Sequence, residues 1–168
     1  IVLMSGRRSA TILIASLALC LSACGFTHMY GAGSAARGLE DIRIETGDER
    51  VDFLLQESLL DAIGSRSGNG RYVLRTETEL NVLALGIGAE AIARRYAIQL
   101  NVTYELLDNI EGAQTHTGQV SVEAAYDASS AAYASQSARL DAEARAAEQA
   151  ADRISMQLAR AAGNGELW

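Results

Sequence analysis

The sequence predicts an α+β fold: a two-layer sandwich in which two helices cover one face of a four-stranded, mainly antiparallel sheet. The first observation is a long alternation of apolar and polar residues over 95–106, which resumes over 119–126. The second is a pair of segments, 48–63 and 134–163, whose apolar residues recur every three or four positions. A period of two is typical of a half-buried strand, and a period near 3.6 is typical of an amphipathic helix.

The first half of the domain is predicted to form a strand, a helix and a second strand. Ile42 and Ile44 alternate with charged residues, as in a short strand with one buried face. Asp48 is placed as the N-cap of the helix, and Gly64 is placed to end it. The apolar face of this helix consists of Val51, Leu54, Leu55, Leu59, Ala62 and Ile63. After a glycine-containing loop, residues 71–79 are predicted to be extended.

The second half is predicted to form a long hairpin followed by a long helix. Even-numbered positions from Tyr96 to Leu106 are apolar, and the odd-numbered ones are mostly polar. The segment 108–112, Asp-Asn-Ile-Glu-Gly, has the composition of a turn between paired strands. From about Ala134 the period changes, and a helix is predicted that ends at Gly163. Its apolar stripe contains Leu140, Ala144, Ala147, Ala151, Ile154, Leu158 and Ala161.

Residues 1–23 have the pattern of a bacterial export signal. Arg7 and Arg8 precede an uncharged apolar run that has secretory length and is short for a permanent membrane span. The run closes on Leu-Ser-Ala-Cys, which resembles the bacterial lipobox, in which the cysteine thiol is alkylated with diacylglycerol. We therefore predict that Cys24 is the lipid attachment site and the first residue of the mature chain, because several acyl chains hold a protein firmly to a membrane.

The rest of the chain is predicted to be a tether followed by one domain. Residues 24–37 are rich in glycine and alanine without a usable period, which is typical of a flexible linker. Residues 38–168 have the length of a single domain. With Cys20 inside the signal and Cys24 lipidated, neither of the two cysteines remains for a disulfide.

The charge of residues 24–168 argues against nucleic acid as a partner. This part of the chain keeps 12 of the 14 basic residues, all of them arginine, and all 21 acidic residues, so that its net charge is −9. Nucleic acid is bound by neutralising its phosphates with surplus positive charge, which this chain lacks.

The sequence offers little support for catalysis, a metal or a cofactor. It contains no Gly-x-Ser-x-Gly or His-Glu-x-x-His motif, and His28 and His116 have no nearby cluster of acids or thiols. His116 has the parity of the buried strand face, which favours a structural role. Residues 86–91 imitate a dinucleotide-binding glycine motif, but too few residues separate them from the alternation at Tyr96 for the required helix. We expect no enzymatic activity, no metal and no cofactor.

An ordered set of short motifs resembles the LptE family of lipopolysaccharide-assembly lipoproteins. The set comprises Cys24-Gly25-Phe26, Tyr30-Gly31, Leu85-Gly86-Ile87, Arg95-Tyr96, Val-Thr-Tyr-Glu-Leu at 102–106, Gly118, Ala125-Tyr126-Asp127, Tyr133-Ala134 and a final Ala/Glu/Arg helix. The chain departs from the family in having no proline after the cysteine. The resemblance implies an outer-membrane lipoprotein on the periplasmic side, which plugs the LptD β-barrel, assists its assembly and binds lipopolysaccharide for insertion at the cell surface.

The lipopolysaccharide that the resemblance implies carries phosphates, which arginine binds through two parallel hydrogen bonds. Arg71 and Arg75 share the polar side of one predicted strand, and Arg95 begins the next strand on its polar side. These three arginines are the candidate binding residues. Three glutamates also lie on polar sides of the strands, Glu77, Glu105 and Glu123. A solvated sheet face of mixed charge is therefore the competing interpretation.

Two functions of other classes stay open at this point. An auxiliary lipoprotein of an envelope lipid ABC transporter is also a small α/β domain on a lipid tether, and it would accompany inner-membrane ATPase components. A small periplasmic hydrolase would need a cleft with a nucleophile and a base within reach of each other. The lack of catalytic motifs counts against the hydrolase, and the ordered motifs favour the barrel partner over the transporter.

Overall fold

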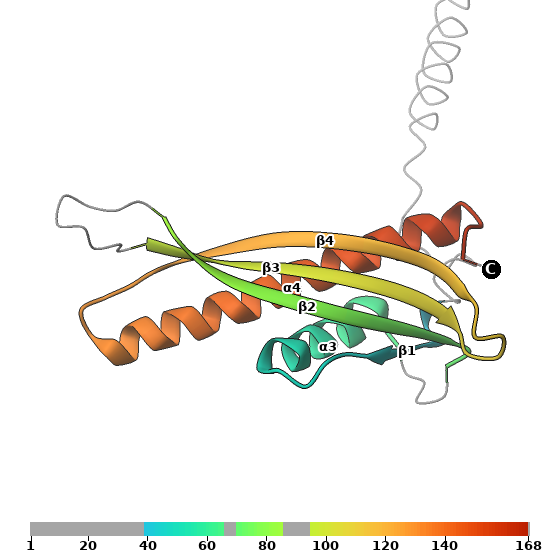
Figure 1. Ribbon diagram of the computed structural model, residues 1–168, viewed down its shortest axis with the longest axis horizontal. Helices are drawn as coiled ribbons and strands as arrows, with labels where there is room; N and C mark the ends of the chain where they lie inside the picture. The colour runs from blue at the N-terminus through green and yellow to red at the C-terminus, as the bar shows by residue number, and fades with distance from the viewer. Residues whose placement is uncertain (1–38, 66–69, 86–94, 168) are drawn as a thin grey trace, which may run out of the picture. The chain divides into compact units, whose positions relative to one another are not determined.

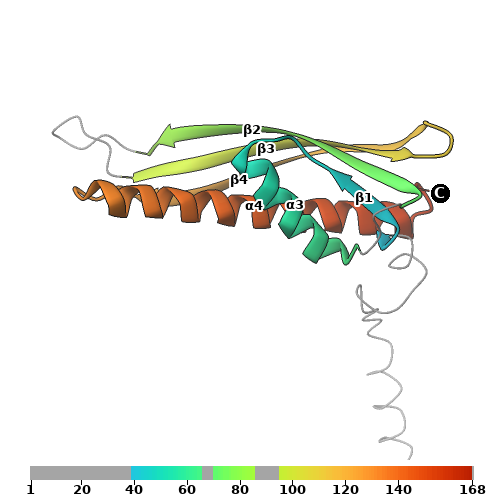
Figure 2. The same ribbon diagram turned by 90° about the horizontal axis from the view of Figure 1, so that it is seen from below.

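Four strands form one sheet in the order β1-β2-β3-β4 in the computed structural model, which describes residues 39–65, 70–85 and 95–167. The strands are β1 (Ile42–Glu45), β2 (Tyr72–Ala84), β3 (Arg95–Asp108) and β4 (Gln114–Asp127). β1 pairs in parallel with the first four residues of β2, and the other pairs are antiparallel. The helices α3 (Arg50–Ile63) and α4 (Ala132–Gly163) lie on one side of this sheet (Figures 1 and 2). The predicted fold class is confirmed.

Several predictions concern parts of the chain that are not described. The signal, Cys24 and the tether all belong to residues 1–37, and the glycine motif belongs to 86–91, so these predictions lie outside the described residues. Among the residues that are described, no helix combines the length and the apolar character that crossing a membrane requires.

The helix α3 begins and ends at local sequence signals. Its N-cap is Glu49 and not the predicted Asp48, because the acid that closes a capping box must stand three residues after the cap. That acid is Asp52, whose Oδ2 accepts a hydrogen bond of 3.0 Å from the backbone N–H of Glu49. At the other end, Gly64 has a φ of 70° and its N–H donates to the carbonyl of Leu60 at 3.0 Å. The predicted stop at Gly64 is confirmed, since only glycine adopts this left-handed conformation without strain.

The strand β2 extends further than the predicted 71–79. It pairs with β3 in an unbroken register from Tyr72 opposite Asp108 to Ala84 opposite Tyr96. Its last residues, Leu-Asn-Val-Leu-Ala, do not alternate cleanly, so the sequence alone places the end of the strand too early. The long partner strand β3 provides backbone groups along the whole of this extension.

The inner face of the sheet carries the predicted alternation. Ile98, Leu100, Val102, Tyr104 and Leu106 of β3 are buried, as are Val120, Val122 and Ala124 of β4. α4 lies along β3 and β4 and buries five alanines around its middle, Ala142, Ala146, Ala147, Ala150 and Ala151. Leu140 and Ala144 of the predicted stripe are only half-buried. Because alanines occur on several sides of this part of α4, their spacing alone does not indicate which face of the helix packs against the sheet.

Tyr104 is the largest fully buried side chain among the described residues and depends on a glycine in the next strand. Its hydroxyl donates to Oε1 of Gln157 on α4 at 2.6 Å, and desolvation raises the pKa of Tyr104. Gly118 lies directly opposite in the register, where an added Cβ would overlap the Tyr104 ring. The half-buried ring of His116 lies 6.2 Å from that of Tyr104, between centroids, in agreement with the predicted structural role of this histidine.

Gly118→Val should destabilise the protein by about 1–3 kcal/mol, because the new side chain must displace Tyr104 from a packed core. The matched control is Gly163→Ala in α4, where no atom lies within 4 Å of an added Cβ. This control should be neutral or stabilise by up to about 1 kcal/mol through helix propensity. Urea unfolding followed by circular dichroism measures both, and equal stability of Gly118→Val and the unaltered chain would contradict the packing described here.

Candidate functional site: the polar face of the sheet

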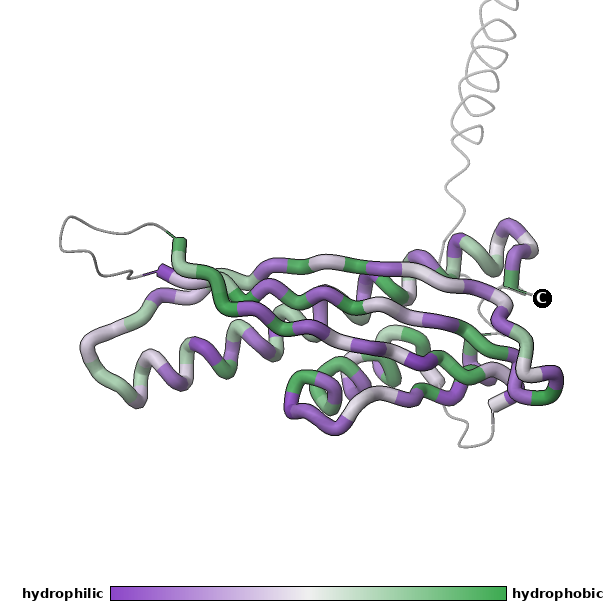
Figure 3. Tube along the Cα trace, in the orientation of Figure 1, coloured by the Kyte–Doolittle hydropathy of each residue, from purple (hydrophilic) through white to green (hydrophobic). Residues whose placement is uncertain are grey.

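The sheet has a second face, directed away from the helices, that is polar. We call it the polar sheet face and define it by the odd-numbered residues of β2 and β3 with their cross-strand partners, since alternate residues point to opposite faces. Three of its rows are Glu77 with Thr103 and Gln119, Glu79 with Asn101 and Ser121, and Asn81 with Gln99 and Glu123. Figure 3 shows hydrophilic and hydrophobic residues alternating along these strands.

Arg75, one of the predicted binding residues, lies in a cross-strand row with two carboxylates. Its Nη1 donates to Oε1 of Glu105 at 3.1 Å, and its Nη2 donates to Oε2 of Glu45 at 3.4 Å. The second oxygen of Glu105 accepts a hydrogen bond of 3.2 Å from Gln114. Arg75 therefore links β1, β2 and β3, and a phosphate would have to displace two carboxylates to bind it.

Arg71 is engaged in closing the β3–β4 hairpin. Its Nη2 lies 3.1 Å from Oδ2 of Asp108, and its guanidinium lies 5.2 Å from the centre of the Tyr72 ring. Oδ1 of Asp108 accepts hydrogen bonds from the backbone N–H groups of Ile110 at 2.8 Å and Glu111 at 3.3 Å. The bond from Ile110 is the main cause that lowers the pKa of Asp108, and the bond to Asp108 raises the pKa of Arg71. The predicted turn at 108–112 is thus fixed by one carboxylate.

Arg95 is the least engaged of the three predicted arginines. Its Nε lies 3.8 Å from Oδ1 of Asp127, and its side chain is 64% exposed. The row of Arg75 meets β3 at Glu105, ten residues from Arg95, which corresponds to about 34 Å at the rise of an antiparallel strand. Arg75 and Arg95 lie in rows of the polar sheet face, whereas Arg71 precedes β2 and contacts Asp108 and Tyr72. The structure therefore does not bring the three arginines together into one site.

The polar sheet face has an excess of acids. The six acidic residues in its rows are Glu45, Glu77, Glu79, Glu105, Glu123 and Asp127, and the three basic ones are Arg43, Arg75 and Arg95, a net charge of −3. Its centre contains amides and hydroxyls, among which Ser121 donates to Asn101 at 2.7 Å. This arrangement agrees with a face of mixed charge and suits hydrogen bonding to another polar surface better than general attraction of phosphates.

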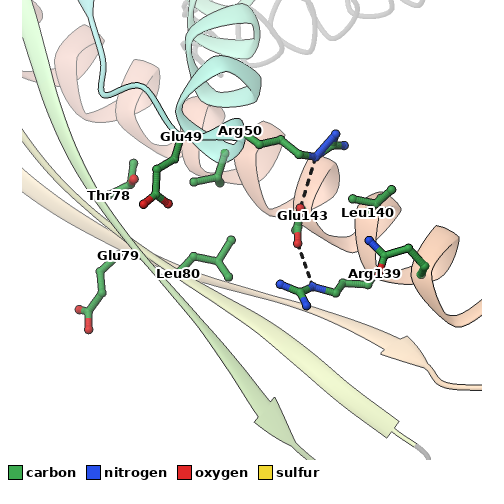
Figure 4. A pocket seen from close by; sticks show the side chains of 10 residues that line it. Glu49, Arg50, Thr78, Glu79, Leu80, Arg139, Leu140 and Glu143 are labelled. Carbon is green, nitrogen blue, oxygen red and sulfur yellow. Dashed lines mark hydrogen bonds and ion pairs between the residues drawn. The ribbon is translucent and has the colours of Figure 1, made fainter.

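A groove of about 590 Å³ on the helix side was not predicted from the sequence. It lies between the N-terminus of α3, the second half of β2 and the first half of α4 (Figure 4). Buried Glu143 accepts from Arg139 at 3.0 Å and lies 3.4 Å from Arg50. The one sequence signal for this groove was Glu143, an acid among the alanines of α4. A carboxylate in such surroundings is buried only when it has a partner of opposite charge. In the described part of the chain, no group of three or more acids, histidines or cysteines is placed to bind a metal.

Comparisons with known proteins agree on one family. The family LptE, described as lipopolysaccharide-assembly, matches residues 39–158. The crystal structure of a protein described as a lipoprotein from Caulobacter crescentus CB15 is similar, with 30% identity over 79% of this chain and 98% of that one and a TM-score of 0.70. The comparison with curated proteins found no match.

Two more distant solved structures share the fold. Rare lipoprotein B from Shewanella oneidensis has 18% identity over 74% of this chain and 98% of that one, with a TM-score of 0.59. Lipoprotein B from Nitrosomonas europaea has 12% identity over 75% of this chain and 85% of that one, with a TM-score of 0.55. At these identities the similarity concerns the fold alone.

A domain whose sheet has one face covered by helices and one polar face left open is suited to binding another molecule through that face. The chain belongs to the LptE family. It is a lipopolysaccharide-assembly lipoprotein and not an enzyme, as the sequence motifs predicted.

Acid should destabilise the hairpin through Asp108. A lowered pKa in the folded state gives a stabilisation that is complete above the ordinary aspartate value of 3.8 and is lost as the pH falls below it. Asp108→Asn should therefore unfold more easily at pH 7 and lose less stability than the unaltered chain between pH 4 and pH 2. Urea unfolding at a series of pH values tests this, with Asp61→Asn on exposed α3 surface as the control. A pH profile of Asp108→Asn parallel to that of the unaltered chain would contradict the role of this carboxylate.

Proposed function

We propose that this protein is anchored in the outer membrane through a lipid on Cys24, faces the periplasm and forms a plug in the LptD β-barrel. Residues 1–23 are the signal that is removed, 24–37 the tether, and 38–168 the domain that enters the barrel. The family assignment supports a role in lipopolysaccharide assembly. The lumen of a large outer-membrane barrel is polar, so the surface that occupies it must be polar as well.

The polar sheet face supports this proposal most directly. Its amides, hydroxyls and carboxylates cover the middle of three long strands, between the rows of Val73 and Leu83, and most residues that fill the core face the helices instead. The polar groups of this face would find hydrogen-bond partners against a polar barrel wall, whereas lipid would leave them without partners. We assign it as the main surface that contacts the barrel and helps it to assemble.

The experiment is affinity purification of the lipidated chain from detergent-solubilised envelopes, with a high-salt wash and mass spectrometry of the proteins retained. Stoichiometric recovery of one large outer-membrane barrel is the expected result. The control variant Cys24→Ser should be lost from the membrane fraction because it cannot accept the lipid. Recovery of inner-membrane transporter subunits, or of no partner, would contradict the proposal and favour the auxiliary-lipoprotein alternative in the first case.

We further propose that the protein binds lipopolysaccharide, with Arg95 contributing most among Arg71, Arg75 and Arg95. Arg95 has the longest ion pair of the three and an exposed side chain, so a phosphate can replace Asp127 at small cost. Arg71 and Arg75 would first have to leave carboxylates at 3.1 Å.

Arg95→Gln should weaken binding of purified lipopolysaccharide by about fivefold to tenfold, the loss of one charge-assisted contact. Arg75→Gln is the matched control on the same sheet face and should change affinity less, although it should lower stability slightly. Titration of the full chain with fluorescent lipopolysaccharide measures both affinities. A larger effect of Arg75→Gln than of Arg95→Gln would contradict the proposal that Arg95 contributes most to lipopolysaccharide binding.

A further inference from the structure

The two edges of the sheet differ in how far their backbone groups are capped by other parts of the chain. At the β4 edge, arginines of α4 occupy backbone carbonyls: Nη2 of Arg145 donates to the carbonyl of Ala125 at 3.0 Å, and Nη1 of Arg153 donates to that of Ser121 at 2.6 Å. A row of unpaired backbone groups is a template for pairing with another chain, and such caps reduce the tendency to pair. α4 therefore partly closes this edge.

The β2 edge is covered only at its beginning. β1 is paired with Tyr72 to Arg75, and the remaining residues of β2 have no strand on their outer side among the described residues. Figure 1 shows β1 beside one end of β2 only, with the other end of β2 extending past it. No hydrogen bond between described residues caps the backbone there.

The pairing pattern identifies which backbone groups face outward. The N–H of Tyr72 donates toward β1, to Asp41 at 3.4 Å, and the N–H of Leu85 donates toward β3, to Arg95 at 2.8 Å. Since successive residues of a strand direct their backbone groups to opposite sides, even-numbered residues of β2 face the open edge. The outward N–H and C=O groups past β1 are those of Thr78, Leu80, Val82 and Ala84.

Three common protections of an edge strand, namely proline, lysine and a β-bulge, are missing from this segment. The chain has no proline, all of its basic residues are arginine, and the β2–β3 register has no bulge. Side chains beside the edge differ on the two faces. Val82 is 42% exposed and follows half-buried Leu80, which lines the groove (Figure 4). Glu77 and Glu79 lie on the polar sheet face and are exposed.

We propose that the β2 edge from Thr78 to Ala84 receives an extended segment of a partner protein, which adds a strand in line with β1. Backbone hydrogen bonds to the four outward residues would hold it, and side chains on its two faces would give specificity. Charge and polarity define the occupant: apolar residues on the side of Leu80 and Val82, and basic residues beside Glu77 and Glu79. A second copy of this chain is disfavoured because it would bring the same glutamates to the shared edge. The inference rests on the proposed function only in the identity of the partner.

The first test is amide hydrogen exchange at single-residue resolution, comparing the free chain with the complex purified from native envelopes. In the free chain, the amides of Thr78, Leu80 and Val82 should exchange rapidly, while those of Glu79 and Asn81 are protected by pairing with β3. In the complex, the even-numbered amides should become protected by about tenfold or more, the effect of new backbone hydrogen bonds. A side-chain contact alone would not produce this alternation.

The second test removes one outward donor. Val82→Pro deletes the N–H that faces the open edge and leaves the β2–β3 hydrogen bonds in place, because proline is tolerated on edge strands. Val82→Thr is the matched control, which changes the side chain and keeps the N–H. Urea unfolding verifies that both variants fold. Retention of the partner in a high-salt wash should fall about tenfold for Val82→Pro and much less for Val82→Thr.

The outcomes separate this inference from the proposed function. Alternating protection with a partner other than the barrel supports the inference and contradicts the barrel assignment. Recovery of the barrel without protection of Thr78, Leu80 and Val82 overturns the inference alone. Protection in a dimer of this chain overturns the choice of occupant, and a chain with no partner overturns both.

Discussion

The packing of small α4 side chains on the inner face of β3 and β4 is the constraint on which the rest of the structure depends. Alanines around the middle of α4 let the helix approach the sheet closely, and Ile154 and Leu158 extend the contact toward its C-terminus. Tyr104 fills the larger space between the two layers, which requires Gly118 opposite and Gln157 above it. Because this contact buries the apolar face of β3 and β4 while α3 packs on β2, the opposite face stays free to be polar.

The ion pairs of the sheet and its hairpin divide the charged residues into structural ones and ones available to a ligand. Arg71 with Asp108 closes the hairpin, and Arg75 with Glu105 connects neighbouring strands. Ion pairs of this exposure contribute modestly to stability, but they determine which guanidinium groups a ligand can reach without competition. Binding to another macromolecule therefore depends on the amides, the hydroxyls and the less engaged charges, which lie in the middle of the sheet and toward Arg95.

The sequence predicts those parts of the fold that a local pattern controls. The alternation from Tyr96 to Leu106 identifies β3 and its buried face, and Gly64 identifies the end of α3, since both depend on periods or on single residues. The partners of Arg71 and Arg75 could not be predicted, because they follow from a cross-strand register that no local pattern specifies. The groove could not be predicted either, since it joins Arg50 of one helix to Glu143 of another. The short coverage of β2 by β1 likewise became visible only in the assembled sheet.

The central claim is that the protein meets its partner through the polar sheet face and leaves the helix layer free. Carboxylate footprinting tests this most directly, because acids are present on both sides. Glu77, Glu79 and Glu123 report on the polar sheet face, whereas Glu57, Asp61 and Glu148 line the outer groove between α3 and α4. In the complex purified from native envelopes, labelling of the first set should fall strongly relative to the free chain, with the second set unchanged. Loss of labelling on the helix side with the sheet side unchanged would contradict the account.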